Sequence, residues 1–294
     1  YMSYDIVRFF EEIPYDTIDD LNLPDCYFVL TDTILVFDHV NHKIKVVSNA
    51  HVEDGDIDAE YEKAIKKIDS LIVSLKKPLF LMDQSPKRIG PAKIQSNFTK
   101  ENFQQAVEKT IDYIEAGDAI QVVLSQRLTV PIAVDSFEFY RALRTINPSP
   151  YMYYLRFDDL HIAGSSPEVM VRVEDRNVQM RPIAGTKPRG KTEEEDQSLE
   201  KELLADPKER AEHIMLVDLG RNDIGRVCEY KSVEVDELMV IEKYSHVMHI
   251  VSNVIGKLRE NKTAFDVIEA CLPAGTLSGC LLYTSDAADE LDGV

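Results

Sequence analysis

The stretch DPKERAEHIMLVDLGRND, residues 206–223, predicts the helix around which the second half of the chain is built. Asp206 is a favourable N-cap, Pro207 suits the first helical position, and Gly220 offers a C-terminal stop. Between them, apolar residues recur at a spacing that predicts one buried side of the helix: Ala211, Ile214, Met215, Val217 and Leu219.

Two carboxylates in this helix suggest chemistry. Glu209 sits where a capping-box acid would, and Glu209 and Glu212 are three residues apart, so both leave the same face one turn apart. Like charges so close repel unless a cation lies between them or both face water. One interpretation is a magnesium site, because Mg²⁺ takes carboxylate oxygens and keeps several waters. The other is a solvated face whose first-turn acids are favoured by the helix dipole.

Composition narrows the class of protein. The 294 residues have 44% hydrophobic and 29% charged side chains, which is typical of a globular chain. A formal net charge of −19 makes nucleic acid and anionic membranes improbable partners. The four cysteines form no CxxC pair and fit free thiols in a reducing cytosol, and no apolar run is long enough to span a bilayer. We therefore expect a cytoplasmic protein.

The first part of the chain predicts a small β-rich unit followed by a helix. Strands are expected at residues 27–30, 34–39 and 43–49, and a helix at 60–75, where apolar side chains recur at helical spacing. Residues 76–98, richer in Pro, Gly, Ser and Lys, indicate a linker. We therefore expect an N-terminal region at 1–90.

The second part, residues 98–279, predicts one larger domain of helices and strands. The helix expected at 99–116 should turn Phe103, Val107, Ile111 and Ile114 inward, and further helices are expected at 135–146 and 263–271. The expected strands are 119–130, 151–157, 161–165, 168–173, 177–183, 231–236, 238–244 and 246–258. Their connections are too short for parallel crossovers. The predicted class is α/β, of α+β character, with two large mostly antiparallel sheets packed face to face and helices outside.

Two loops could hold a ligand. In RPIAGTKPRG, residues 181–190, Gly185 permits close backbone approach and the N–H groups of Gly185 and Thr186 could grip an oxyanion, with Lys187 and Arg189 making the loop cationic. The alternative is an ordinary strand-to-helix connection. In PAGTLSG, residues 273–279, backbone N–H groups and the Thr276 hydroxyl could do the same, or form a plain turn.

Three further positions have both a functional and a structural interpretation. Glu168 follows a proline at a strand start, where a carboxylate either points into a cleft or marks a strand edge. His249 lies in an apolar strand, where a satisfied core histidine is the commoner outcome. The aromatic stripe Tyr151–Tyr154 is expected to pack in the core.

Taken together, the motifs resemble those of one family. QVVLSQR, NPSPYMYYL, GSSPE, RPIAGTKPRG, DPKERAEHIMLVDLGRNDIGRV, YSHVMHIVS and PAGTLSG occur in the order found in the chorismate-utilising enzymes. The resemblance runs from about Phe98 to Gly279 and is closest to anthranilate synthase component I. It implies that chorismate and ammonia are converted to anthranilate and pyruvate with Mg²⁺, and that a glutamine amidotransferase subunit, component II, supplies the ammonia.

The resemblance also implies roles for single residues. Glu212 resembles the Mg²⁺ ligand, and Glu209 resembles a carboxylate that acts through water. Gly185, Thr186 and Thr276 resemble substrate-binding positions. Glu168 resembles the general acid that protonates the departing 4-hydroxyl, which requires a raised pKa, and His249 resembles the residue that supports loss of pyruvate. Pro150, Tyr151 and Met152 resemble part of a tryptophan feedback site.

Two positions separate the branches of the family. Where this chain has Gln121, the isochorismate branch has a lysine that activates water, so ammonia is the expected nucleophile here. Where this chain has Ala184, aminodeoxychorismate synthases commonly carry a lysine. Both point to anthranilate, but aminodeoxychorismate synthase component I stays open as an alternative. So does a non-catalytic module that binds an amino acid or an anion.

The chain departs from the family pattern after Gly279. Residues 280–294, CLLYTSDAADELDGV, continue neither the expected helix nor the later strands, and we interpret them as a non-native tail. The segment that would bring a second Mg²⁺-binding glutamate, and a tyrosine and an arginine that hold substrate, does not follow. The early part of the tryptophan site is also missing. We therefore expect the 294 residues by themselves to be inactive or nearly so.

Overall fold

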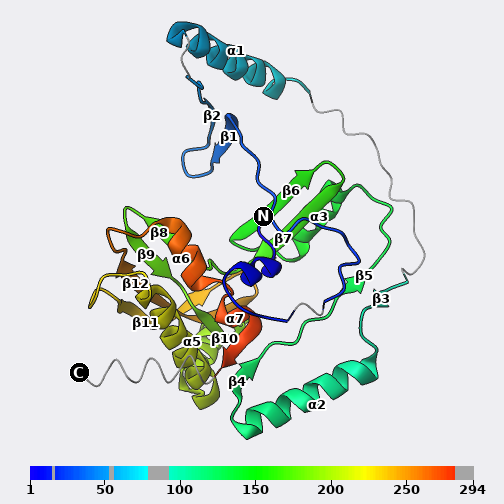
Figure 1. Cartoon of the computed structure of the whole chain (residues 1–294), viewed down its shortest axis with the longest axis vertical. Coiled ribbons are helices and arrows are strands. Elements are labelled where there is room, and N and C mark those ends of the chain that lie inside the picture. The colour runs from blue at the N-terminus through cyan, green and yellow to red at the C-terminus, as the bar shows by residue number, and fades with distance from the viewer. Residues whose placement is uncertain (15–16, 53–55, 79–92, 282–294) are drawn as a thin grey trace. The chain divides into compact units, whose positions relative to one another are not determined.

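The computed structural model describes residues 1–14, 17–52, 56–78 and 93–281, with only the backbone described for residues 276 and 278–281. The chain divides into two compact units, residues 1–87 and 88–294, and each is described by itself (Figure 1). The functional domains expected at 1–90 and 98–279 stay predictions.

The first unit is a β-hairpin with a helix packed on it. A short 3₁₀ helix, η1 (Tyr4–Phe9), precedes the antiparallel strands β1 (Thr33–Asp38) and β2 (Lys43–Ser48), and α1 (Ile57–Leu75) packs on β2. The strand expected at 27–30 is wrong. The backbone of residue 27 bonds to the chain start, and no strand in the described part of this unit pairs with the segment.

The second unit is centred on a five-stranded antiparallel sheet of β8 (Arg172–Glu174), β9 (Asn177–Met180), β10 (Ile183–Pro188), β11 (Glu234–Lys243) and β12 (Val247–Lys257). β9 and β10 pair with successive halves of one edge of β12, and β11 pairs with its other edge. The two strands expected at 231–236 and 238–244 are one strand, β11. Two register shifts, rather than a break, interrupt its pairing with β12.

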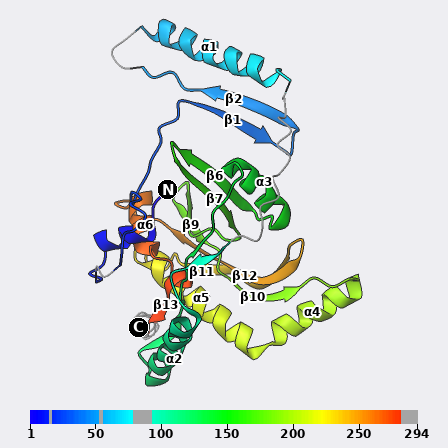
Figure 2. The same cartoon turned by 90° about the vertical axis from the view of Figure 1, so that its right-hand side faces the viewer.

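Two consecutive helices lie against this sheet. α4 (Glu193–Ala205) and α5 (Pro207–Gly225) meet at Asp206, which ends the first and accepts N–H bonds at the start of the second. Figure 2 shows them joined at an angle beside β10. α6 (Ala264–Cys271) and the short α7 (Gly275–Ser278) contact α5 from the other end.

α5 buries only part of the side expected: Val217 is buried, whereas Ala211 is exposed. Gly220 does not stop the helix, which runs on to Gly225. This glycine is packed within the fold, and a side chain there would meet Met180 and Val254 at van der Waals distance. Ile214 is 40% exposed. The buried positions are His213, Leu216, Val217, Gly220, Asp223 and Ile224. The pattern failed because it counts only apolar residues, and this face includes a histidine, a glycine and an aspartate.

The rest of the second unit is more open. The helix α2 (Lys100–Ala116) begins at the Thr99 cap as predicted but buries none of its residues, so the expected inward face is wrong. The strand expected at 119–130 is split into β4 (Ala119–Val122) and β5 (Leu128–Thr129), which pair with β13 (Gly279–Leu281) and β3 (Gln95–Ser96). Each half has a different partner, so the run cannot continue straight.

The helix α3 (Ser136–Ile146) packs on a hairpin of β6 (Tyr151–Phe157) and β7 (Leu160–Ser166). The predicted class is confirmed: a mixed α/β chain with antiparallel sheets and helices. In the described residues the strands form one five-stranded sheet and four two-stranded ones, so the two large sheets expected are not seen there, because the strands outside the five-stranded sheet pair only two by two. The helices of the described part are too short or too polar to span a bilayer.

Candidate functional site

A bulge in β10 forms the centre of the site. The pairing of β10 with β12 shifts register between Ala184 and Thr186, which leaves Gly185 as the extra residue, with a positive φ of 79°. A side chain at Gly185 would begin 3.1 Å from Ile250 Cδ1 and 3.2 Å from Glu209 Oε2. Glycine is therefore required both by the backbone conformation and by the approach of the Glu209 carboxylate.

His249 lies directly across the sheet from Thr186. Its Nδ1 is 3.0 Å from Thr186 Oγ1 and 3.3 Å from the carbonyl oxygen of Gly185. The ring of Tyr244 packs edge-on against the imidazole, with ring centroids 5.4 Å apart. Gly185, Thr186, Glu209 and His249, which we call the bulge cluster, thus come together from two strands and a helix.

The first turns of α5 carry two carboxylates, Glu209 of this cluster and Glu212. Glu209 and Glu212 are half-buried and lie one turn apart. In the described residues no set of three His, Cys, Asp or Glu side chains could hold a metal. Two carboxylates, one of them against the space left by a glycine, still fit Mg²⁺, because this ion accepts one or two carboxylates and completes its shell with water.

Glu168 lines a separate cavity of about 310 Å³. The walls come from the β7–β8 loop, the break between β9 and β10, one side of α5 and the segment around α7: Ser166, Glu168, Met170, Met180, Arg181, Pro182, Leu216, Leu219, Gly220, Asp223, Ala274, Gly275 and Leu277. Burial raises the pKa of Glu168 to about 7, and the backbone N–H of Ile183, which bonds to the carboxylate, opposes the rise. The carboxyl group can therefore carry a proton near neutral pH.

Asp223 is a second acid in this cavity, and the sequence analysis assigned it no role. It is 6% exposed, and burial raises its pKa to about 7 against the opposing charge of Arg226. A signal was present, because Glu212, Leu216, Gly220 and Asp223 follow one another at helical steps of three or four along a single side of α5.

The basic loop does not present free cations. Lys187 Nζ lies 2.5 Å from Glu202 Oε1, and the Arg189 guanidinium is bonded to Asp196. Both acids come from α4, so the positive charge expected in this loop is neutralised within the fold. A ligand would meet backbone N–H groups and hydroxyls here instead.

The remaining predicted positions are less informative. Thr276 belongs to α7 by its backbone, and its side chain lies outside the described residues. Pro150, Tyr151 and Met152 lie at the start of β6, the first two exposed and the third half-buried. Burial and the hydrogen bond to Glu242 raise the pKa of Tyr244 to about 12.

The profile of the chorismate-binding enzymes matches residues 1–280. The chain belongs to this family. Anthranilate synthase component 1 of Acetivibrio thermocellus is 50% identical over 300 residues, which cover 100% of this chain and 60% of that protein. The Aquifex aeolicus protein of the same name is 50% identical over 280 residues, 95% of this chain and 56% of its own length.

Solved structures agree with this membership. Anthranilate synthase component I from Streptococcus pneumoniae superposes with a TM-score of 0.82 at 38% identity, covering 95% of this chain and 61% of its own. The isochorismate synthase MenF from Escherichia coli, at 20% identity and a TM-score of 0.62, covers 85% of this chain and 59% of its own, and shows the shared fold only. The chain thus spans about 60% of the length of these relatives.

Proposed function

We propose that the chain is the chorismate-binding part of an anthranilate synthase component I. That enzyme converts chorismate and ammonia to anthranilate, pyruvate and water. The observation that carries the proposal is the bulge cluster: residues assigned by resemblance to substrate binding, metal binding and catalysis come together from positions 185, 186, 209 and 249. Relatives at 45% to 50% identity bear this name.

Chorismate carries two carboxylates, and the described site must bind them without free side-chain cations in the β10 loop. The backbone around Gly185 and the hydroxyl of Thr186 are suited to orient one carboxylate. Glu212, with Glu209 acting through water, would hold Mg²⁺. When bound, this ion supplies the positive charge that an anionic substrate needs beside two glutamates.

We assign Glu168 the role of general acid, because its carboxyl group can carry a proton near neutral pH. Ammonia bonds to ring carbon 2 while the bond from carbon 4 to its hydroxyl breaks, and Glu168 donates the proton with which that hydroxyl leaves as water. A pKa of about 7 keeps part of the Glu168 population protonated at neutral pH. Loss of the carbon-2 proton and of the enolpyruvyl group, released as pyruvate, then makes the ring aromatic, a step that His249 supports.

We further infer that the ammonia comes from a glutamine amidotransferase subunit, that tryptophan binds around Pro150, Tyr151 and Met152, and that the enzyme is cytoplasmic. Gln121, in β4, and the buried Ala184 leave the site without a lysine at either of the positions that distinguish the other branches. This composition favours ammonia over water as the nucleophile.

The test measures chorismate binding by titration calorimetry in magnesium buffer and in chelator. It uses the 294 residues and a version completed with the remaining segment of the Acetivibrio thermocellus relative. We expect the completed version to bind only with magnesium and to form fluorescent anthranilate of the correct mass. Glu212→Gln should abolish the magnesium-dependent binding of chorismate, whereas Glu202→Gln, which changes an exposed acid on α4, should preserve it.

Two outcomes would contradict the proposal. Equal binding in chelator would support the non-catalytic module. A product with the mass of aminodeoxychorismate would indicate an aminodeoxychorismate synthase component I instead. Anthranilate formation by the 294 residues themselves would refute the expectation that they are inactive.

A further inference from the structure

Three ion pairs fasten α4 to β10, to the residue that follows β10 and to β11, and one of them differs from the others. Glu200 bonds to Lys243 at 3.0 Å and Glu202 to Lys187 at 2.5 Å, with the two glutamate side chains 34% and 61% exposed. Asp196, which bonds to Arg189, is only 3% exposed at its side chain. Exposed pairs contribute little, so the buried pair is the one with structural consequence.

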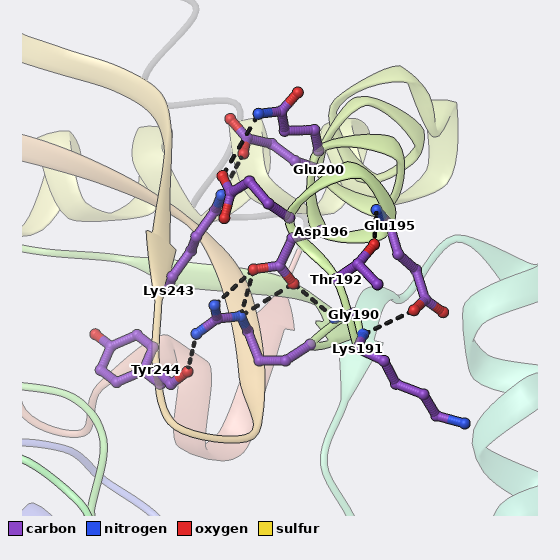
Figure 3. Close-up of polar contacts among 11 residues, drawn as sticks. Gly190, Lys191, Thr192, Glu195, Asp196, Glu200, Lys243 and Tyr244 are labelled. Carbon is purple, nitrogen blue, oxygen red and sulfur yellow. Dashed lines mark hydrogen bonds and ion pairs between the residues drawn. The ribbon is translucent and has the colours of Figure 1, made fainter.

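The Asp196 carboxylate accepts hydrogen bonds from two consecutive residues of the loop that follows β10. Arg189 Nε lies 3.1 and 2.9 Å from its two oxygens, Arg189 Nη2 lies 2.5 Å from Oδ2, and the Gly190 N–H donates to Oδ1 at 2.6 Å. Figure 3 shows the Asp196 carboxylate reaching from α4 to the loop at Gly190. This two-oxygen geometry fixes the guanidinium plane as well as its position.

The fixed guanidinium also holds the turn between β11 and β12. Arg189 Nη1 donates to the Tyr244 carbonyl at 2.6 Å, and the Arg189 backbone N–H donates to the His246 carbonyl at 3.1 Å. The Tyr244 hydroxyl donates to Glu242 at 2.7 Å, so this residue is held at its backbone and at the tip of its ring. The ring between those two points is the one that packs against His249.

We propose that Asp196 is a positioning residue for His249. It acts through Arg189 and Tyr244 to keep the imidazole against Thr186 and the Gly185 carbonyl. The contacts run without a gap from α4 to the bulge cluster and join residues 55 positions apart in the chain. The catalytic meaning of this link rests on the proposed function, whereas the link itself does not.

The experiment follows the His249 ring by NMR in the 294-residue chain labelled at histidine Cε1, with His249→Gln used to assign its signal. We expect Asp196→Asn to shift or split that signal and to speed amide exchange at Tyr244 and His249 about tenfold. Glu200→Gln and Glu202→Gln, which cut the other two ion pairs of α4, should leave the His249 signal in place.

Folding failure is separated from loss of positioning by a second variant. The double change Arg189→Met with Asp196→Leu replaces the buried pair by apolar side chains, which often preserves stability, but it removes the donor to Tyr244. A folded double variant with a displaced His249 signal supports the proposal, and an unchanged signal overturns it. Because no substrate is present, failure of the proposed function would not alter either result.

Discussion

Glu209 and Glu212 lie in the first turns of α5, whereas Asp223 lies in its last turn, and the two ends differ in their surroundings. The first pair is half-buried, and Glu209 lies against Gly185 in the bulge. Asp223 is 6% exposed in the cavity that it shares with Glu168. The helix dipole favours negative charge at the start of a helix and disfavours it at the end. The start of α5 therefore suits ionised carboxylates that bind a cation, and its end suits a protonated acid.

This contrast divides the labour of the proposed reaction. The start of α5 and the bulge would bind the charged groups of the substrate, and the acids in the cavity at the other end would hold and donate protons. Both acids of the cavity have a pKa near 7 for the same reason, burial without an ion-pair partner strong enough to offset it. The comparison fails if the acids of the cavity behave as ordinary surface carboxylates.

The largest effect is expected for Glu168→Gln in the completed enzyme. Loss of a general acid typically lowers kcat by about 10²–10⁴-fold, with little change in KM because the proton is needed only in the transition state. In the unaltered enzyme, kcat should fall as the pH rises through about 7, since Glu168 then loses its proton. Steady-state anthranilate fluorescence across pH measures both.

Glu174→Gln is the matched control, because Glu174 is an exposed glutamate of β8 paired with Arg172. It should keep both the rate and its pH profile. An active Glu168→Gln variant would remove the cavity from the mechanism.

The next effect concerns stability and is expected for Asp223→Asn. The pKa of Asp223 is about 7 in the fold and 3.8 without it, so the folded state binds the proton more tightly. The stability linked to this proton is fully present below about pH 4 and is lost as the pH rises toward 7. The asparagine variant avoids that loss and should be more stable than the parent by up to about 4 kcal/mol at pH 8.

Urea unfolding of both proteins between pH 4 and 8 tests this expectation. The two stabilities should converge at the acid end. Asp218→Asn, which changes a half-exposed acid of the same helix, should show no such pH-dependent gain. A difference between Asp223→Asn and the parent that is constant over the whole range would mean that Asp223 is not the group that titrates.

The sequence predicts well the features that depend on residues within one helical turn of each other, such as helix caps. Asp206, Thr99 and Asp135 start their helices as expected, and Thr263 forms its capping box with Asp266, because a cap bonds to N–H groups two or three residues away. The sequence also indicated Gly185 as a position where the backbone can approach a ligand closely, and this glycine is the extra residue of the bulge.

What the sequence does not predict depends on partners far along the chain. Gly220 looks like a helix stop until β9 and β12 are packed against it, and the strand expected at 119–130 divides because its halves meet different neighbours. The raised pKa of Asp223 arises from burial, which no local pattern states. The pairing of Arg189 with Asp196 depends on where α4 lies, and the sequence analysis did not place that helix.

The smallest of these effects is expected at the bulge, from Gly185→Ala. An alanine must adopt a φ of 79° and place its Cβ 3.1 Å from Ile250 and 3.2 Å from the Glu209 carboxylate, so something has to move. We expect a loss of about 1–3 kcal/mol in the free energy of unfolding. Magnesium-dependent chorismate binding should weaken as well, because the Glu209 carboxylate is one of the two groups that the new Cβ would push aside.

Gly225→Ala is the control, since a side chain there meets nothing within 4 Å. It should leave stability unchanged or slightly raised, because alanine is the better helix former. Denaturant unfolding and calorimetry of the completed chain separate the two glycines. If Gly185→Ala lost stability but bound chorismate and magnesium normally, the bulge would be a packing requirement only, and the start of α5 would lose its place in the site. If Gly185→Ala lost chorismate binding while Gly225→Ala kept it, the region around Glu209 would be where α5 meets the ligand.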